Sequence, residues 1–379
     1  MINRSFSSFL TLFTVASLTS LAGLSCAGEQ VQSAEKAKPI PVIYCTDLFH
    51  PHDDPDDHFD LAMIYAIPEL EIKAIILDQG RKQLTKPGRI PVSQMNRITG
   101  RNVPVAIGLA EKLTGPEDKG LDQPEQFQTG VELLLKTVRE SPIPLNIITV
   151  GSVRDLAAAF NREPELFREK AARVMSFIGE ASTPFLEYNV ELDPAAYVCL
   201  IRSGLPVYWV PCFDGRREGP EMLNNGHASY WKADHEALLQ DCAPEVLQYF
   251  IYCFEKQTAP PLDFLNQPPE VESVERLFAG KRNLWCTAVF TALTDRRIVT
   301  DGARFLSVPS DSAAGLAEHR LFDFETVYVT ISDDGQISYG EREGARKIMR
   351  FKVADMENYA VGMTSVTAQF LSGLRTRRR

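Results

Sequence analysis

Short apolar runs alternate with segments of helical periodicity along the first 210 residues. Strands that alternate with helices predict an α/β fold with a mainly parallel, doubly wound sheet flanked by helices on both faces. In such sheets ligands bind beyond the carboxyl ends of the strands. The apolar runs predict strands at residues 40–45, 72–77, 103–107, 145–150, 174–178 and 207–210, and the periodic segments predict helices at residues 59–67, 126–139, 153–160 and 194–201.

The pattern loosens between residues 214 and 280, where Gly, Asn and Pro interrupt it and only residues 244–256 predict a helix. Further on, two apolar runs at 327–331 and 337–339 flank a polar turn and predict a β-hairpin. No internal repeat is evident, so residues 39–379 are interpreted as a single domain.

The N-terminal residues have the features of an export signal. Arg4 precedes an uncharged apolar stretch and a group of small residues. This predicts a signal peptide over residues 1–27, a polar tether over 28–38 and an exported, periplasmic or secreted, protein. Cleavage before Cys26 would give a lipid-anchored protein instead, but Gly23 stands where bacterial lipoproteins usually carry a branched apolar residue. The soluble form is therefore favoured, and no later segment is apolar and long enough to span a bilayer.

The composition excludes some functions. Of 379 residues, 44% are hydrophobic and 24% charged, which is ordinary for a soluble globular protein. The net charge of −10 argues against nucleic acid as a partner, because duplex binding needs clustered Lys and Arg. The seven cysteines show no CxxC spacing, and we interpret them as buried free thiols although export permits disulfides. The sequence leaves open whether the chain forms a homo-oligomer.

An acidic loop carries the strongest chemical signal. Residues 47–60 contain six aspartates and three histidines between an apolar strand and an apolar helix. Like charges this close raise one another's pKa unless a cation compensates them, and oxygen-rich ligand sets favour Ca²⁺ or another hard ion. The histidines keep zinc open as an alternative. Without a metal, Asp56 and Asp57 would still stabilise the start of a helix, but capping does not account for all six aspartates.

Three motifs together resemble a known family. Thr46-Asp47 at a strand end, followed by Asp56-Asp57 at a helix start, is similar to the N-terminal signature of the inosine–uridine-preferring nucleoside hydrolases, although the loop here is longer. The segment LNIITVGSVRDLA at 145–157 looks like that family's strand, glycine turn and helix. The most specific likeness is TPFLEYN at 183–189, followed by DPAA at 193–196, which resembles TPxxExN and DPxAA. The likeness covers about residues 40–211 and is faint beyond.

The resemblance implies a reaction and a set of roles. The reaction is hydrolysis of the N-glycosidic bond of a ribonucleoside or similar small riboside, with a calcium-bound water as the nucleophile. The roles it implies are a proton acceptor at Asp47, Ca²⁺ ligands at Asp47, Asp57 and the Val150 carbonyl, and ribose contacts from Asp56, Asn189 and Glu187. A ribose suits such groups because carboxylates and amides bind hydroxyls. Glu187 and Asn189, two apart on a segment expected to be extended, should face the same side.

One departure from the family separates two interpretations. Members carry a His-Asp pair late in the chain, in which Asp binds calcium and His assists the leaving base; Trp285 and Cys286 stand there in this sequence. A thiol is a poor calcium ligand, and an indole is not a useful acid. Either another side chain compensates in a divergent hydrolase, or the protein is an exported riboside-binding protein without turnover. The candidates for the lost ligand are His50, Asp53 and Asp54. Those for a substitute acid are His50, His52, His227 and His235.

A third interpretation is a glycosidase of another kind, which would use two of the loop carboxylates as acid and base in an open groove.

Overall fold

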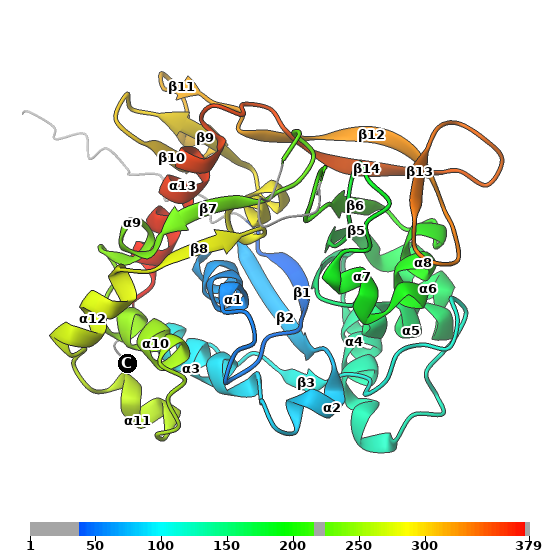
Figure 1. Ribbon diagram of the computed structural model, residues 1–379, viewed down its shortest axis with the longest axis horizontal. Coiled ribbons are helices and arrows are strands. Elements are labelled where there is room, and N and C mark those ends of the chain that lie inside the picture. Colours follow the sequence, from blue (N-terminus) through cyan, green and yellow to red (C-terminus); the bar gives the residue numbers. More distant parts are fainter. Residues whose placement is uncertain (1–37, 216–223, 376–379) are drawn as a thin grey trace, which may run out of the picture. The chain divides into compact units, whose positions relative to one another are not determined.

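The computed structural model describes residues 38–215 and 224–375 (Figure 1). From Lys38 onward the chain forms one compact unit. The predicted signal peptide, Cys26 and all of the tether except Lys38 lie outside the described residues.

A nine-stranded sheet forms the centre of this unit. It is parallel from β14 to β3 and antiparallel at the β14, β12 and β13 edge, which confirms the predicted mainly parallel α/β fold. The chain winds outward in one direction from β1 to β3 and in the other from β4 to β6. The strands follow the order β13 (Ile337–Tyr339), β12 (Phe322–Ile331), β14 (Arg346–Val353), β6 (Val207–Val210), β5 (Ala171–Phe177), β4 (Leu145–Val150), β1 (Ile40–Thr46), β2 (Leu70–Leu77) and β3 (Val105–Ile107).

The boundary between β1 and β4 is therefore the point at which the strand order reverses. Open α/β sheets bind ligands at such a point, beyond the carboxyl ends of the two strands. Asp47 directly follows β1, and Val150 is the last residue of β4. The fold thus brings two of the residues implied by the resemblance to the expected binding position.

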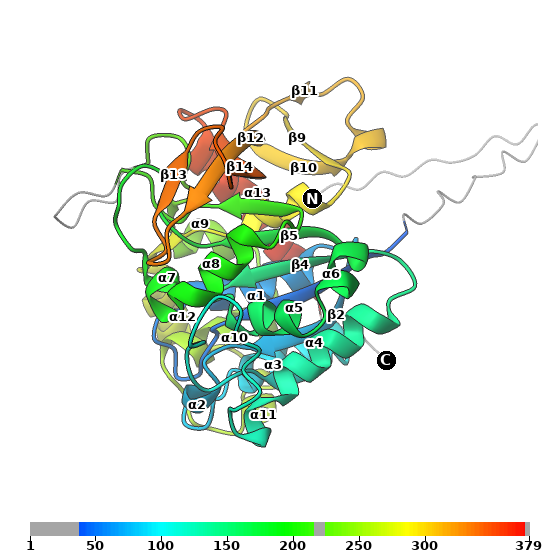
Figure 2. The same ribbon diagram turned by 90° about the vertical axis from the view of Figure 1, so that its right-hand side faces the viewer.

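Helices cover both faces of the sheet because its central strands are apolar on both sides. In β1, Val42 and Tyr44 enter one core cluster while Ile43 and Cys45 enter the other. Figure 1 shows α1 to the left of β1 and α5 and α8 to its right, and Figure 2 shows the second layer from the front. The first layer contains α1 (Asp56–Ala66), α3 (Arg89–Thr99), α10 (Pro244–Phe254) and α13 (Tyr359–Gly373), and the second α4 (Thr129–Glu140), α5 (Arg154–Arg162) and α8 (Pro194–Arg202).

The loosely patterned region contains more structure than the sequence predicts. Strands β7 (Trp231–Asp234) and β8 (Lys281–Leu284) pair across almost fifty residues, and short helices fill the interval. The helices not yet named are α2 (Gly80–Gln83), α6 (Pro164–Lys170), α7 (Tyr188–Leu192), α9 (His235–Leu239), α11 (Pro261–Leu265) and α12 (Val271–Phe278), with 3₁₀ turns at Glu125–Phe127, Thr287–Leu293 and Ser310–Ser312. A small separate sheet is formed by β9 (Arg296–Thr300), β10 (Phe305–Pro309) and β11 (Ala317–Glu318).

The structure also bears on the cysteines and on membrane-spanning helices. The six cysteines within the described part of the chain are free, and five of them are buried, as the interpretation as buried thiols required. Across the described residues, the structure contains no helix with the length and apolar character needed to cross a membrane.

Candidate active site

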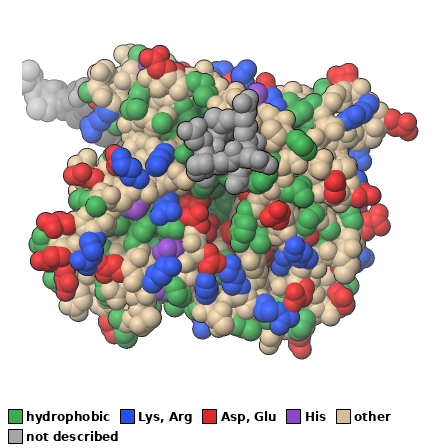
Figure 3. Space-filling view, viewed as in Figure 1, with side chains coloured by type: hydrophobic (Ala, Val, Ile, Leu, Met, Phe, Trp, Pro, Cys, Tyr) green, Lys and Arg blue, Asp and Glu red, His purple; other side chains and the backbone are tan. Residues whose placement is uncertain are grey.

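A cavity of about 460 Å³ opens at the carboxyl ends of β1 and β4, which is in the size range of small-molecule pockets. All six residues to which the resemblance assigns a role line it. Figure 3 shows acidic side chains gathered in a hollow near the middle of this face, with basic side chains close to it. The lining residues are Asp47, Phe49, Asp53, Asp54, Asp56, Asp57, Asp60, Lys82, Val150, Gly151, Phe177, Glu187, Tyr188, Asn189, Cys212, Phe213, Trp285 and Cys286.

Asp47 is held by the pairing of β1 with β4. Its backbone N–H donates to the carbonyl of Val150 at 3.2 Å, and its Oδ2 accepts from Gln79 Nε2 at 3.4 Å. Burial and the nearby carboxylate of Asp78 raise the pKa of Asp47 to about 8. A carboxylate in this environment is a stronger base than usual and gains from a neighbouring cation.

The paired aspartates open α1 directly behind Pro55, so their carboxylates lie at a helix N-terminus. Burial, followed by the charge of Asp54, raises the pKa of Asp56; burial, followed by the charge of Asp47, raises that of Asp57. These groups repel one another although the helix end favours their negative charge. The site therefore concentrates more carboxylates than the protein alone neutralises.

The donor set suits a hard cation such as calcium. Asp47 and Asp57 would supply carboxylate oxygens. The Val150 carbonyl oxygen accepts a hydrogen bond from the Asp47 N–H with one lone pair and would bind the ion with the other. Across residues 38–215 and 224–375, no three His, Cys, Asp or Glu side chains are arranged to hold a metal ion. The Ca²⁺ ligands that the resemblance implies include only two such side chains, Asp47 and Asp57, and the third ligand is a backbone carbonyl.

Glu187 and Asn189 reach the same cavity, but not from an extended segment. Glu187 is the extended N-cap of α7, whereas Asn189 lies inside this short helix, so the expected alternation of side chains is wrong. The carboxylate of Glu187 accepts from the backbone N–H of Asn189 at 2.9 Å and of Gly179 at 2.8 Å. Burial raises the pKa of Glu187 to about 7 despite these hydrogen bonds. Tyr188 between them is half exposed at the cavity.

The longer acidic loop is fixed by ion pairs with two other parts of the chain. Asp53 pairs with Lys82 on α2 and with Lys86, and Asp54 pairs with Arg282 on β8 at 3.1 Å. Partial burial opposes ionisation of Asp53, but the two ammonium groups outweigh it and lower its pKa. Both aspartates line the cavity, yet their charges are already balanced.

The loop histidines lie behind the cavity wall. His50 is buried, its Nε2 lies 2.7 Å from the Gln257 carbonyl oxygen, and its ring stacks on Tyr252. His52 and His58 pack edge to face against each other. None of the six histidines, all of which lie within the described residues, lines the cavity. The hypothesis that His50 replaces a missing ligand or acid there is therefore wrong.

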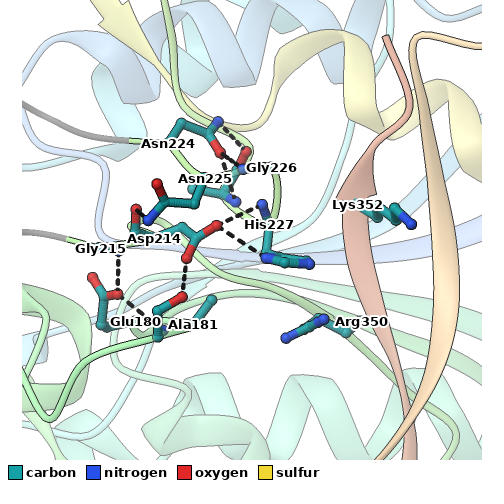
Figure 4. A network of polar contacts seen from close by, with 12 residues as sticks. Glu180, Ala181, Asp214, Gly215, Asn224, Asn225, Gly226, His227, Arg350 and Lys352 are labelled. Carbon is teal, nitrogen blue, oxygen red and sulfur yellow. Dashed lines mark hydrogen bonds and ion pairs between the residues drawn. The ribbon is translucent and has the colours of Figure 1, made fainter. Parts of the chain in front are cut away.

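His227 and His235 are also directed elsewhere. The buried carboxylate of Asp214 accepts from the backbone N–H of His227 at 2.8 Å and faces its Nδ1 at 3.1 Å (Figure 4). The other ring nitrogen of His227 lies 3.6 Å from Glu325 on β12. His235 Nδ1 lies 2.9 Å from the carbonyl oxygen of Leu277. Both histidines therefore support the structure around the cavity instead of entering it.

Trp285 and Cys286, which the resemblance aligns with the family's His-Asp pair, line the cavity. The indole Nε1 donates to the Cys212 carbonyl at 2.8 Å. The Cys286 thiol is buried against Asp60, and burial followed by this carboxylate raises the thiol pKa. Asp60 also accepts from the backbone N–H of Thr287 at 3.0 Å, and burial raises its pKa to about 7. The carboxylate of Asp60, from α1, thus lies beside Cys286, the residue that the resemblance aligns with the family's calcium-binding Asp.

Comparison with known proteins identifies the family. The sequence profile described as "Inosine-uridine preferring nucleoside hydrolase" matches residues 46–366. The chain belongs to this family. The match extends far beyond residue 211, so the faint likeness inferred for the second half was an underestimate.

Individual relatives agree with the profile. A pyrimidine-specific ribonucleoside hydrolase RihA from Citrobacter koseri is 35% identical over 191 residues, and RihA from Salmonella typhimurium is 32% identical over 190 residues. Each alignment covers 44% of this chain and spans 58% of the length of that relative. The structure of the plant nucleoside hydrolase PpNRh1 has a TM-score of 0.52 at 17% identity, covering 90% of this chain and 100% of that one. This supports the nucleoside hydrolase fold.

Some lining residues of this nucleoside hydrolase family member escape prediction from the sequence. Asp60 belongs to the acidic loop motif, and its spacing of three and four residues from Asp57 and Asp56 places it one helical turn on. That spacing was a usable signal. Lys82 and Phe213 carry no comparable signal, because their positions at the cavity depend on the path that the chain takes after β2 and after β6.

Proposed function

We propose that the protein hydrolyses the N-glycosidic bond of ribonucleosides. The observation that carries the proposal is the convergence of Asp47, Asp56, Asp57, Glu187 and Asn189 around one cavity at the point where the strand order reverses. Carboxylates and an amide are suited to binding the vicinal hydroxyls of a ribose. The same negative charge would stabilise the positive charge that develops on the sugar as the base departs.

We assign the acceptance of a proton from the attacking water to Asp47. Its carboxylate lines the cavity at the end of β1, and a bound cation would keep it ionised and able to accept a proton. Asp56 and Asn189 would hold the ribose, with Glu187 at the far hydroxyl. When bound between Asp47, Asp57 and the Val150 carbonyl, Ca²⁺ would orient and acidify the water. Export would place this reaction outside the cytoplasm.

The remaining cavity wall suits a nucleobase. Phe49, Phe177, Phe213 and Trp285 line it, and aromatic faces stack on bases of any kind. The relatives named RihA are described as pyrimidine-specific, so uridine and cytidine are the first substrates to test, followed by inosine.

One observation favours a second function. Because no histidine lines the cavity, the site lacks the family's usual acid, and an exported riboside-binding protein would also need only the sugar and metal contacts. The two functions differ in turnover.

The deciding experiment mixes the purified protein with uridine, cytidine and inosine, with and without Ca²⁺, and measures released base and ribose. Hydrolysis is expected only with Ca²⁺, and Asn189→Leu should abolish riboside binding. Tight binding of uridine without release of ribose would support the binding protein, and neither binding nor release would refute both.

A further inference from the structure

Departure of a nucleobase needs a proton, and the residue that supplies it here is not the family's histidine. The resemblance aligns Trp285 with that histidine. General acid help contributes ~10²–10⁴-fold to rate, so catalysis at this site would gain from a donor on another element. The donor has to line the cavity and have a hydrogen that is not already committed to the protein.

Two cavity-lining donors already make hydrogen bonds to the protein. Trp285 Nε1 donates to the Cys212 carbonyl at 2.8 Å, so its only N–H points into the wall. Asn189 Nδ2 donates to the Phe177 carbonyl at 3.3 Å. An amide is also too weak an acid to give up a proton, so Asn189 is suited to binding hydroxyls and not to protonating a base.

Three more donors carry hydrogen but are poorly suited. Lys82 forms an ion pair with Asp53 and lies over the ring of Phe49 at 4.2 Å. Removing its proton would leave Asp53 with one ammonium partner fewer. The thiols of Cys212 and Cys286 are buried in the cavity wall, and Cys286 is packed against Asp60.

Tyr188 remains. It is the first residue of α7, its side chain is 52% exposed at the cavity, and no hydrogen-bond partner of its hydroxyl is found among residues 38–215 and 224–375. Burial, followed by the charges of Asp47 and Asp53, raises its pKa to about 12, so it keeps its proton at neutral pH.

The neighbours of Tyr188 position it further. Glu187 and Asn189, to which the proposed function assigns sugar hydroxyls, flank it in the chain and line the same cavity. Glu187 is anchored by two backbone N–H groups, from Gly179 and Asn189. Because all three residues line one cavity, a riboside held by Glu187 and Asn189 would also lie close to Tyr188.

We propose that Tyr188 is the general acid that protonates the departing base, an inference that rests on the proposed function. As the C1′–N bond breaks, its electron pair stays with the base nitrogen, which takes the phenolic proton of Tyr188. Water adds to C1′ and loses a proton to Asp47. Solvent then returns this proton to the Tyr188 phenolate, which leaves ribose, the neutral base and the starting enzyme.

The test replaces the hydroxyl alone, in Tyr188→Phe, and compares leaving groups. With uridine and inosine, kcat/KM should fall ~10²-fold or more, because the base needs a proton. With p-nitrophenyl riboside, whose leaving group is stable as an anion, the fall should be less than ~3-fold. A merely structural role would lower both to the same extent. The loss should lie in kcat, with KM for uridine nearly unchanged.

Tyr230→Phe is the matched control. Its hydroxyl donates to Asn283 Oδ1 at 3.2 Å, and its ring lies 5.8 Å from that of Trp285, outside the cavity lining. It should leave the ratio between the two kinds of substrate unchanged. A second comparison, Lys82→Met, tests the competing donor. If Lys82→Met and not Tyr188→Phe produced the dependence on leaving group, Lys82 would be the acid and the inference would be wrong.

The outcomes separate this inference from the proposed function. Uridine cleavage by the unaltered protein that persists in Tyr188→Phe would overturn the role of Tyr188 and leave the proposed function intact. No cleavage of any riboside by the unaltered protein would overturn both. A loss confined to the nucleosides would support both.

Discussion

Gly151 determines how closely the β4 turn approaches the carboxylates at the end of β1. Its φ of +124° lies in the region that favours glycine. A Cβ built on it would lie 2.9 Å from Asp78 Oδ2 and 3.2 Å from Asp47 Oδ1. Asp78 cannot easily move away, since the same oxygen accepts from the backbone N–H of Ser152 at 2.8 Å. The glycine therefore serves the site as well as the turn.

Gly151→Ala should consequently weaken calcium binding and lower stability together. We expect ~1–3 kcal/mol of lost stability from backbone strain, with calcium affinity reduced at least ~10-fold if Asp47 is displaced from a shared ligand position. Isothermal titration with Ca²⁺ and chemical unfolding measure the two effects. Gly204→Ala is the control, because its φ is also positive, at +73°, but nothing lies within 4 Å of its Cβ. It should lose stability alone; equal calcium affinity in both variants would contradict the prediction.

Single residues also show what the sequence can predict. Asp47, Asp56 and Asp57 were identifiable because each stands at the border of an apolar strand or helix, where the fold leaves little choice of position. His50 was misjudged, since its burial against Tyr252 depends on contacts made by α10. Asp78 also follows an apolar strand, but no neighbouring acidic residues mark it as part of a motif, as they do for Asp47.

Among the secondary-structure elements, the start of α8 explains the DPAA motif structurally. Asp193 caps the helix by accepting from the backbone N–H of Ala196 at 3.0 Å, and Pro194 follows at the first helical position. Its other oxygen pairs with Arg154 of α5 at 2.8 Å and accepts from the backbone N–H of Leu113 at 2.8 Å. Both charged groups are almost fully buried. The motif thus joins two helices of the layer beneath the site.

Replacing one partner of this pair should be costly. Asp193→Ala leaves the guanidinium of Arg154 buried and unpaired, which typically destabilises by about 3–5 kcal/mol. The free energy of unfolding from a urea titration measures the loss. Asp333→Ala is the control, because it removes an exposed pair with Arg202 and should cost less than ~1 kcal/mol. Similar losses in the two variants would show that the buried pair is not structural.

The elements that the sequence did not predict are strands that pair with segments far away in the chain. Strands β4 and β6 have the predicted bounds, because continuous apolar runs determine buried parallel strands. The late hairpin of β12 and β13 is also confirmed, since its turn is local. Strands β7 and β8 were missed because Trp231 faces Leu284 only after the chain between them has folded.

At the scale of the whole molecule, the position where the strand order reverses concentrates acidic groups in one place. The sheet brings Asp47 and Glu187 together from separate motifs, and burial raises their pKa values to about 8 and about 7. Asp60 has a pKa raised to about 7 for the same reason. The unfolded chain titrates these groups near 4. Between these values the folded protein holds more protons than the unfolded chain, so the stability of the metal-free protein falls as pH rises.

The calcium hypothesis therefore predicts a pH dependence of stability that the metal removes. Buried histidines such as His58, whose pKa burial lowers, add stability as pH rises to about 6.5 and nothing beyond. Between pH 6.5 and 8 only the raised acids should act on stability. In a chelator, the melting temperature should fall across this window. With Ca²⁺ it should stay level, because binding favours the ionised carboxylates and stabilises the folded state. Differential scanning fluorimetry measures both curves.

Asp57→Asn tests the assignment of this effect to the cavity. It removes one of the two proposed carboxylate ligands, so the variant should show little difference between chelator and Ca²⁺ at pH 8. Asp323→Asn alters an aspartate paired with Arg320 on the surface, and it should keep the full calcium response. Because these measurements need no substrate, they test the metal separately from catalysis. A melting temperature that Ca²⁺ leaves unchanged in the unaltered protein at pH 8 would refute the calcium site even if ribosides were cleaved.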